Sequence, residues 1–310
     1  MADTPLGLTL PEGFARYMFA LIGTAIVIGC VVGSFLVEGG SVMLLWHPAE
    51  VVTICGAALG AFVISNPIKI VKASFASSIG LVKGPKYKRE DYVDLLKLLY
   101  DILVKIRKSG MLAIEADIEK PHESKLFSEY PRIVADHHMV EFITDCLRLI
   151  IGGNLDPHEL ESLLDYELET HHHEAEGPAH AIQKVADALP GFGIVAAVLG
   201  IVNTMAAIDG ASSAEIGEKV GAALVGTFLG ILVAYGIVGP IASAVEHRVH
   251  EESKVFDVVK MALVASVRGY APPVAVEFAR KLLWSDVRPT FGDLETHLKG
   301  KGRAGAKEAA

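Results

Sequence analysis

Two long apolar stretches in the second half of the chain constrain its fold more than any other feature. They cover residues 188–205 and 220–240, and both are rich in glycine and free of charged side chains. A helix of ~20 apolar residues crosses the hydrocarbon core of a bilayer, and each stretch is close to that length. Only residues 206–219 separate them, so the pair predicts a membrane hairpin. Pro190 stands near the start of the first stretch and Pro240 ends the second.

The composition indicates a membrane protein that also has a sizeable soluble part. The mean hydropathy over 310 residues is +0.41, and the apolar residues are gathered in blocks. The formal net charge of -9 resides in the soluble part and argues against nucleic acid as a partner. The three cysteines, Cys30, Cys55 and Cys146, have neither a disulfide framework nor metal-site spacing.

Two further apolar segments precede the hairpin, at residues 14–37 and 48–65, and Asn66-Pro67 ends the second. The chain is therefore expected to cross the membrane four times. We read all four spans as free of Asp, Glu, Lys, Arg and His. Because intramembrane ionisable groups usually mark an ion path, we expect this chain to supply no titratable group at mid-bilayer by itself. Without a partner, the spans would form a passive anchor.

The segments outside the spans have helical periodicity and no alternating strand pattern, which predicts an all-α protein. Residues 68–83 combine an apolar stripe with lysines. They fit a helix in the lipid headgroup region and fit an ordinary surface helix equally well. Further helices are expected over residues 89–108, 111–119, 131–151, from Asp156-Pro157 onward, 242–267 and 274–284.

Lysine and arginine are dense after the second span and recur after the fourth, whereas the two short loops carry few. The positive-inside rule then places the large domain and both termini in the cytoplasm. The last two membrane helices are expected to extend into the cytoplasm. The predicted organisation is an N-terminal segment 1–13, two spans in 14–66, a cytoplasmic helical domain in 67–187 with its interfacial helix at 68–83, two spans in 188–241, cytoplasmic C-terminal helices in 242–298 and a disordered tail in 299–310.

Several ordered segments are similar to one known family. They include Asp-Ile-Glu-Lys-Pro-His-Glu-Ser at 117–124, Tyr-Pro-Arg-Ile at 130–133, Gly-Tyr-Ala-Pro-Pro-Val-Ala-Val-Glu-Phe at 269–278 and the hairpin itself. Together they resemble the MotA family, the ion-channel subunits of the bacterial flagellar stator within the MotA/TolQ/ExbB superfamily. The resemblance implies an inner-membrane homopentamer around two copies of MotB, whose membrane helix carries the aspartate that this chain lacks. It also implies that ion flow drives torque on the rotor protein FliG, in the service of motility and chemotaxis.

The resemblance assigns roles to two charged residues and two prolines. Arg107 and Glu115 match the family's charges that face FliG, although without the family they would be read as ordinary surface charges. Pro190 and Pro240 match the pair that couples ion binding to movement. Pro190 could also be a first-turn proline that starts a helix, whereas Pro240 lies within a continuous helical pattern and is the better hinge candidate.

Two positions bear on the ion. Ala197 matches a position where sodium-driven relatives carry threonine, and a methyl group cannot supply an oxygen to Na+. Thr227 occurs in relatives of both kinds. Its hydroxyl could bond its own helix backbone or hydrate the partner's carboxylate, as could Asn203 and Thr204 near the end of the previous span. We therefore expect H+ rather than Na+ as the ion, with no bound cofactor or metal.

Two rival functions remain open in the sequence. One is an ExbB/TolQ-type subunit that energises outer-membrane processes, and the other is a membrane-anchored scaffold without transport. The histidine run at residues 171–173 is interpreted as a helix surface rather than a metal site. No nucleophile–base pair, phosphate loop or metal signature is present, so the chain is not expected to be an enzyme.

Overall fold

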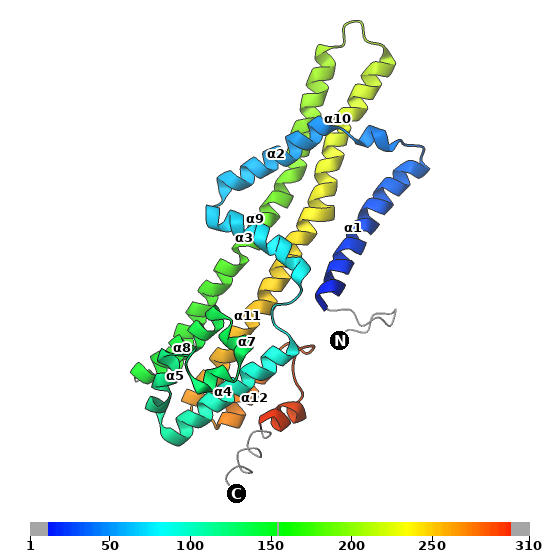
Figure 1. The fold of residues 1–310 in the computed structure, drawn as a ribbon. Coiled ribbons are helices and arrows are strands. Elements are labelled where there is room, and N and C mark those ends of the chain that lie inside the picture. Colours follow the sequence, from blue (N-terminus) through cyan, green and yellow to red (C-terminus); the bar gives the residue numbers. More distant parts are fainter. Residues whose placement is uncertain (1–11, 154, 299–310) are drawn as a thin grey trace. The chain divides into compact units, whose positions relative to one another are not determined.

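The structure is a computed structural model that describes residues 12–153 and 155–298, with side chains from residue 21 onward. All regular elements in this described part are helical (Figure 1), which confirms the all-α prediction. Apart from residues 12 and 13, the predicted N-terminal segment 1–13 lies outside the described residues, and so does the predicted tail 299–310. The chain divides into two compact units. The hairpin unit is Met1–Pro85 with Ala175–Val249, and the helical unit is Lys86–Glu174 with His250–Ala310.

The hairpin unit holds the apolar helices. Its elements are α1 (Glu12–Val37), η1 (Val42–Leu45), α2 (Pro48–Ser65), α3 (Ile68–Gly80), η2 (Leu81–Lys83), the second half of α9 (Pro157–Ala206), α10 (Ser213–Val233), the π-helical η4 (Ala234–Val238) and the start of α11 (Gly239–Val267). By length and composition, the helical stretches Val42–Ser65, Pro157–Ala206 and Ser213–Val267 are long and apolar enough to cross a membrane. Leu21–Val37 is a shorter apolar helix. The chain is a multi-pass membrane protein.

Helix α2 packs against α9 and α10 through a small buried cluster. Ile54 and Ala58 from α2 meet Leu189 and Ala196 from α9, with Ala234 at the start of η4. The predicted helix over residues 68–83 is present as α3 followed by η2. Its buried Ser74 donates to the carbonyl of Ile70, 2.9 Å away, and lies 3.4 Å from the carbonyl of Pro178 on α9. These contacts tie α3 to the hairpin.

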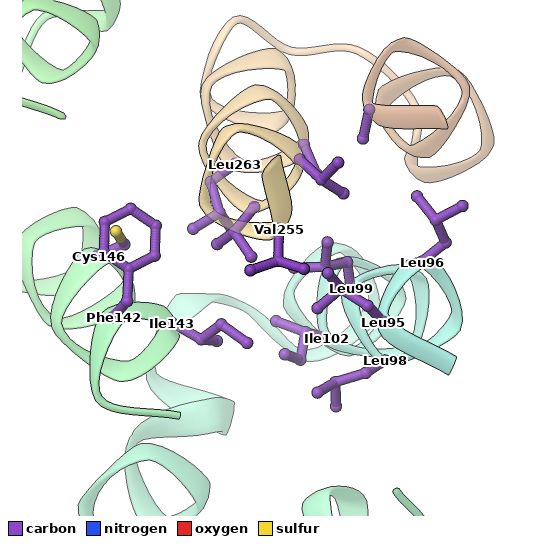
Figure 2. Close-up of a cluster of buried hydrophobic side chains, with 14 of the residues drawn as sticks. Leu95, Leu96, Leu98, Leu99, Ile102, Phe142, Ile143, Cys146, Val255 and Leu263 are labelled. Carbon is purple, nitrogen blue, oxygen red and sulfur yellow. The ribbon is translucent and has the colours of Figure 1, made fainter. Parts of the chain in front are cut away.

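The helical unit is built around α4, whose apolar residues recur every three or four positions. Its elements are α4 (Arg89–Ser109), η3 (Met111–Ile114), α5 (Glu115–Glu119), α6 (Lys125–Ser128), α7 (Pro131–Val134), α8 (His137–Gly152), the first part of α9, the rest of α11, α12 (Pro272–Lys281) and a helix at residues 291–298. Leu95, Leu99 and Ile102 are buried against Ile143 of α8 and Val255 of α11 (Figure 2).

The sequence prediction of one helix over residues 131–151 was wrong, because α7 ends at Val134 and α8 begins at His137. Asp136 separates them and accepts a 3.4 Å bond from the backbone N–H of Met139 as the N-cap of α8. Tyr87 donates its hydroxyl to this carboxylate at 2.5 Å, and Lys86 pairs with it at 2.8 Å. Burial alone would raise the pKa of Asp136, but the bonds from Lys86 and Tyr87 outweigh burial and lower that pKa below its usual range.

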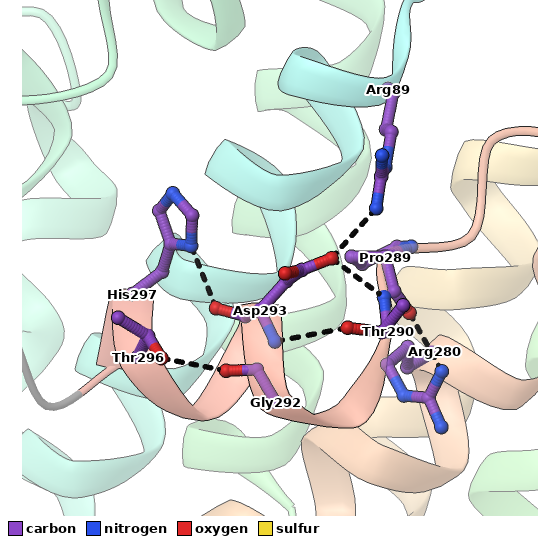
Figure 3. Close-up of polar contacts among 8 residues, drawn as sticks. All are labelled: Arg89, Arg280, Pro289, Thr290, Gly292, Asp293, Thr296 and His297. Carbon is purple, nitrogen blue, oxygen red and sulfur yellow. Dashed lines mark hydrogen bonds and ion pairs between the residues drawn. The ribbon is translucent and has the colours of Figure 1, made fainter.

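The C-terminal end of the helical unit is fastened by polar contacts (Figure 3). Arg280 is buried and donates to the carbonyl of Pro289 at 2.7 Å while its other nitrogens bond Glu277. Thr290 and Asp293 cap the helix at residues 291–298 reciprocally, and Arg89 of α4 pairs with Asp293 at 2.8 Å. These contacts join the last described helix to the first helix of the unit.

Candidate functional site

The hairpin is the first candidate site, because α9 and α10 approach each other along facing rows of small residues. A Cβ added to Gly193 would lie 2.9 Å from the carbonyl oxygen of Gly226, and one added to Gly230 would lie 2.7 Å from that of Leu189. On Gly200, it would lie 2.7 Å from the Cβ of Ala223. The neighbouring atoms are mostly backbone, so these positions admit only small side chains. Close backbone approach through glycine and alanine is the usual packing mode of membrane helices.

The two threonines of the hairpin, Thr204 and Thr227, behave differently. Thr204 is buried and donates to the carbonyl of Gly200 on its own helix at 2.8 Å, which confirms for this residue the backbone-bonding alternative. The Thr227 hydroxyl instead lies 3.5 Å from the carbonyl of Gly193 on the opposite helix. That distance is at the outer limit of a hydrogen bond, so Thr227 is held only weakly. Ala197, on the buried part of α9, is 6% exposed.

The expectation that the spans carry no ionisable residue was wrong for α2. Glu50 is the third residue of that helix, inside the apolar stretch Val42–Ser65. Its carboxylate is turned against the glycine rows of the hairpin, where a Cβ on Gly226 would collide with Glu50 Oε2 and one on Gly200 would lie 3.7 Å from Oε1. Among the described residues, the buried Oε2 has no hydrogen-bond partner. By their own bounds, the predicted spans 14–37 and 48–65 contain Arg16 and Glu50, and the expectation overlooked both residues.

The two hinge candidates both lie within helical backbone. Pro190 is inside α9, which runs without a break from Pro157 to Ala206, so the alternative that it starts a helix is wrong. Pro240 follows η4, a π-helical turn in which the N–H of Gly239 bonds the carbonyl of Ala234. A proline removes one backbone donor and clashes with the preceding turn, and a widened π turn is one way to accommodate it.

The two charged residues predicted to face the rotor flank a tight connection in the helical unit. Arg107 lies in the last turn of α4, and Glu115 begins α5. Gly110 between them has φ +84°, a left-handed conformation that glycine adopts without strain. Both charged side chains are exposed and, within the described chain, take part in no ion pair or hydrogen bond. Leu112, on the same connection, is 72% exposed.

A buried polar cluster beneath this connection fixes its shape. The Asp117 carboxylate forms an ion pair with Lys105 of α4 at 2.5 Å and accepts a hydrogen bond from the Ser124 hydroxyl at 2.7 Å. Ile114 is fully buried in the core of the unit. Since α4 and α5 are joined on both sides of the turn, the connection presents its unpaired charges from a rigid base.

The histidine run has a local structural explanation. The ring of His171 packs against that of Phe256 at an interplanar angle of 55°, with centroids 4.5 Å apart. Across the described residues, no three His, Cys, Asp or Glu side chains gather in a way that could hold a metal ion.

Comparisons with known proteins identify the family. Residues 21–110 match the family description "Motility protein A N-terminal", and residues 135–258 match "MotA/TolQ/ExbB proton channel family". Motility protein A of Salmonella typhimurium is 47% identical over 282 residues, which cover 91% of this chain and 95% of that protein. Motility protein A of Escherichia coli is 46% identical over the same share of each chain.

Solved structures agree with the fold. The structure of C. jejuni MotAB superposes with a TM-score of 0.68 at 17% identity, covering 88% of this chain and 99% of that one. The flagellar MotAB stator complex from Bacillus subtilis gives a TM-score of 0.62 at 22% identity, covering 83% and 92%. The resemblance noted in the sequence is thereby confirmed. The chain belongs to the motility protein A family, a branch of the MotA/TolQ/ExbB proton channel family and a family of channel and motor subunits rather than enzymes.

Proposed function

We propose that this chain is the MotA subunit of a flagellar stator, which forms a proton channel with MotB and converts proton flow into torque on FliG. The observation that carries this proposal is the 47% identity to a motility protein A over 91% of the chain. Identity of that extent favours the stator over the ExbB/TolQ-type rival. It also favours a channel subunit over an inert scaffold.

The proposed topology has four spans with both termini in the cytoplasm. α1, α2 and the hairpin formed by α9 and α10 supply the spans, and α3 lies near the headgroups. The asymmetry of lysine and arginine supports this orientation. In this arrangement the domain boundaries are those expected from the sequence, with the helical domain and the C-terminal helices on the cytoplasmic side of the inner membrane.

The proposed assembly has five copies of this chain around two copies of MotB. The exposed apolar surface of the hairpin is compatible with an oligomer. Many of its large apolar side chains are exposed, among them Ile194, Val198, Val202 and Leu224. Such a surface suits lipid or neighbouring membrane helices. Thr227, held by one long contact, is free to turn its hydroxyl toward the partner's aspartate.

The proposed ion is H+. At Ala197 the side chain offers no oxygen, whereas a sodium ion needs oxygen ligands in place of its hydration shell. A proton needs only a carboxylate and a path through water. In the proposed cycle, the MotB aspartate takes a proton from the periplasm, turns to a new neighbour in the ring and releases the proton to the cytoplasm. Pro190 and Pro240 are the points at which the long helices bend as the ring steps.

Arg107 and Glu115 are proposed to act on charged groups of FliG. Exposed ion pairs contribute only ~0–1 kcal/mol each. Contacts of this size suit a rotor surface to which the stator must bind and from which it must dissociate at every step of rotation. The rigid base formed by Lys105 and Asp117 supports the role, because torque cannot be transmitted through a loose loop.

The rotor surface is tested by charge reversal in cells that lack their own stators and express this chain with its cognate MotB. Arg107→Glu combined with Glu115→Lys is expected to lower torque and to reduce the number of stators that a fluorescent tag detects at each motor. Lys281→Glu, at another exposed charge, in the last turn of α12, is the matched control and should leave both unchanged. Unaltered torque and recruitment in the double variant would contradict the assignment.

A further inference from the structure

Glu50 is a carboxylate of the hairpin unit that the proposed cycle does not use. Its carboxylate comes from α2 and reaches across to two helices, beside Gly226 of α10 and Gly200 of α9. The glycines form a cradle, because a Cβ at Gly226 would occupy the place of Oε2. The carboxylate oxygen is buried there without a hydrogen-bond donor from the described chain.

Glu50 is half-buried, and the enclosed oxygen of its carboxylate has no donor within the described chain. An ionised carboxylate in apolar surroundings is costly unless it is paired or hydrogen-bonded, and it otherwise exchanges its charge for a proton. Ionisable side chains inside membrane segments face the bundle interior or a water path and mark proton relays. Glu50 faces the interior of its unit, against the hairpin.

The position of the cradle connects Glu50 with the proposed ion path. Gly226 directly precedes Thr227, whose hydroxyl is proposed above to turn toward the partner's aspartate. Glu50 stands in the first turn of α2, which in the proposed topology is the periplasmic end of that helix. The carboxylate therefore lies between the outer surface and the Thr227 level.

Few other charges surround this group. His47, the N-cap residue just before α2, acts on Glu50 electrostatically, and its Nδ1 is also buried without a partner in the described chain. The stretch of α9 from Gly191 to Ala206 carries no ionisable side chain, and the first charged residues outward along α10 are Lys219 and Glu218. None of these charged groups forms an ion pair with the Glu50 carboxylate in the described chain.

We propose that Glu50 is a proton-exchange group at the outer entrance of the channel, and this inference rests on the proposed stator function. In the first step the Glu50 carboxylate takes a proton from hydronium on the periplasmic side, forming an O–H bond and leaving water. In the second step that O–H bond breaks, and the proton passes to the carboxylate on the partner's membrane helix. Glu50 returns to its ionised form, and charge balances at each step.

The test uses the complete stator in cells lacking their own stators, with single-motor speed measured at low load across a series of external pH values. Glu50→Gln keeps the size of the side chain and removes the exchangeable proton. Speed per stator is expected to fall on the order of tenfold or more, since a positioned acid–base group contributes ~10²–10⁴-fold to proton transfer. Its dependence on external pH should also flatten. Glu38→Gln, an exposed carboxylate at the end of the preceding apolar helix, is the matched control and should behave as wild type.

Each outcome is informative when stators are counted at the motor by fluorescence. Slowed rotation with a flattened pH profile at normal recruitment supports the role of Glu50. A Glu50→Gln motor with the wild-type speed and pH profile overturns it. If that variant does not assemble, Glu50→Asp decides by the same two readouts, and failure of both variants to assemble assigns Glu50 to structure alone and overturns the proposal. A wild-type chain that assembles but does not rotate the motor would instead contradict the stator function itself.

Discussion

Replacing Gly230 by alanine tests whether the two hairpin helices depend on backbone contact. The added Cβ would lie 2.7 Å from the carbonyl oxygen of Leu189 and 3.0 Å from the Cα of Gly193. Ordinary contacts of a Cβ begin at 3.4 Å, so α9 and α10 would have to separate by about 0.7 Å at this level. The atoms in the way are backbone and cannot turn aside as a side chain would. Overpacking of this kind typically costs ~1–3 kcal/mol.

Gly221→Ala provides the matched control within the same helix. A Cβ at Gly221 meets nothing within 4 Å in this chain. Both substitutions gain the same helix propensity, about 1 kcal/mol for alanine over glycine, and that gain cancels when the two variants are compared. The Gly230 variant should therefore be less stable than the Gly221 variant by the overpacking cost alone.

Thermal unfolding of the purified full-length protein in detergent, followed by circular dichroism, measures the difference. A change of 1 kcal/mol shifts Tm by ~2–4 °C for domains of 150–250 residues, so Gly230→Ala should melt several degrees below Gly221→Ala. Equal melting temperatures would refute the argument, because they would show that the helices can move apart at no cost.

Three further predictions concern other parts of the chain. Asp136→Asn keeps an N-cap but removes a carboxylate of lowered pKa, and it should cost about 1–3 kcal/mol at pH 7. In denaturant unfolding this deficit should begin to shrink below pH ~4, where the aspartate of the unfolded wild-type chain becomes protonated, and it should be lost as pH falls through the lower pKa of the folded state. A deficit that stayed constant down to pH 2 would count against this. Asp117→Asn leaves Lys105 without its ion pair, and it should lower motor torque while stators still reach the membrane. Bead rotation measures the torque and immunoblotting of membranes measures the stators. Normal torque would contradict the proposal that this ion pair makes the connection rigid. Pro190→Ala should slow rotation at unchanged stator number, whereas Pro178→Ala, in the same helix, should not; equal speeds would remove Pro190 as a hinge.

Much of the fold follows from residue patterns that are compatible with only one kind of regular structure. An uncharged stretch of membrane-spanning length can satisfy its backbone in lipid only as a helix, which is why the hairpin was predictable. The apolar repeat through Leu95, Leu99 and Ile102 has one helical reading, and Gly110 supplies the left-handed residue that ends it. Arg107 and Glu115, by contrast, were singled out only by family resemblance, because their exposure gives no local signal.

The errors arose where a local signal competed with a longer-range one. The apolar period across residues 131–151 predicts one continuous helix. The helix instead ends at Val134, and Asp136 caps the start of a second helix. Pro190 resembled a helix start because the charge-free run begins beside it, yet the helix continues from Pro157. The glycines that face the Glu50 carboxylate, Gly200 and Gly226, lie far along the chain from it, so sequence spacing could not reveal the contact. A glutamate flanked by apolar residues in Ala49-Glu50-Val51 was the available warning.

The most direct test of the central claim is single-motor rotation in cells lacking their own stators. The cells would express this chain with its cognate MotB, and rotation would be recorded across a sodium series at fixed external pH. A proton-driven stator, with the methyl group of Ala197 beside the path, predicts rotation at a speed that does not change with sodium. A speed that rises and falls with the sodium concentration would contradict the proton assignment. An assembled complex that produces no rotation would contradict the stator function.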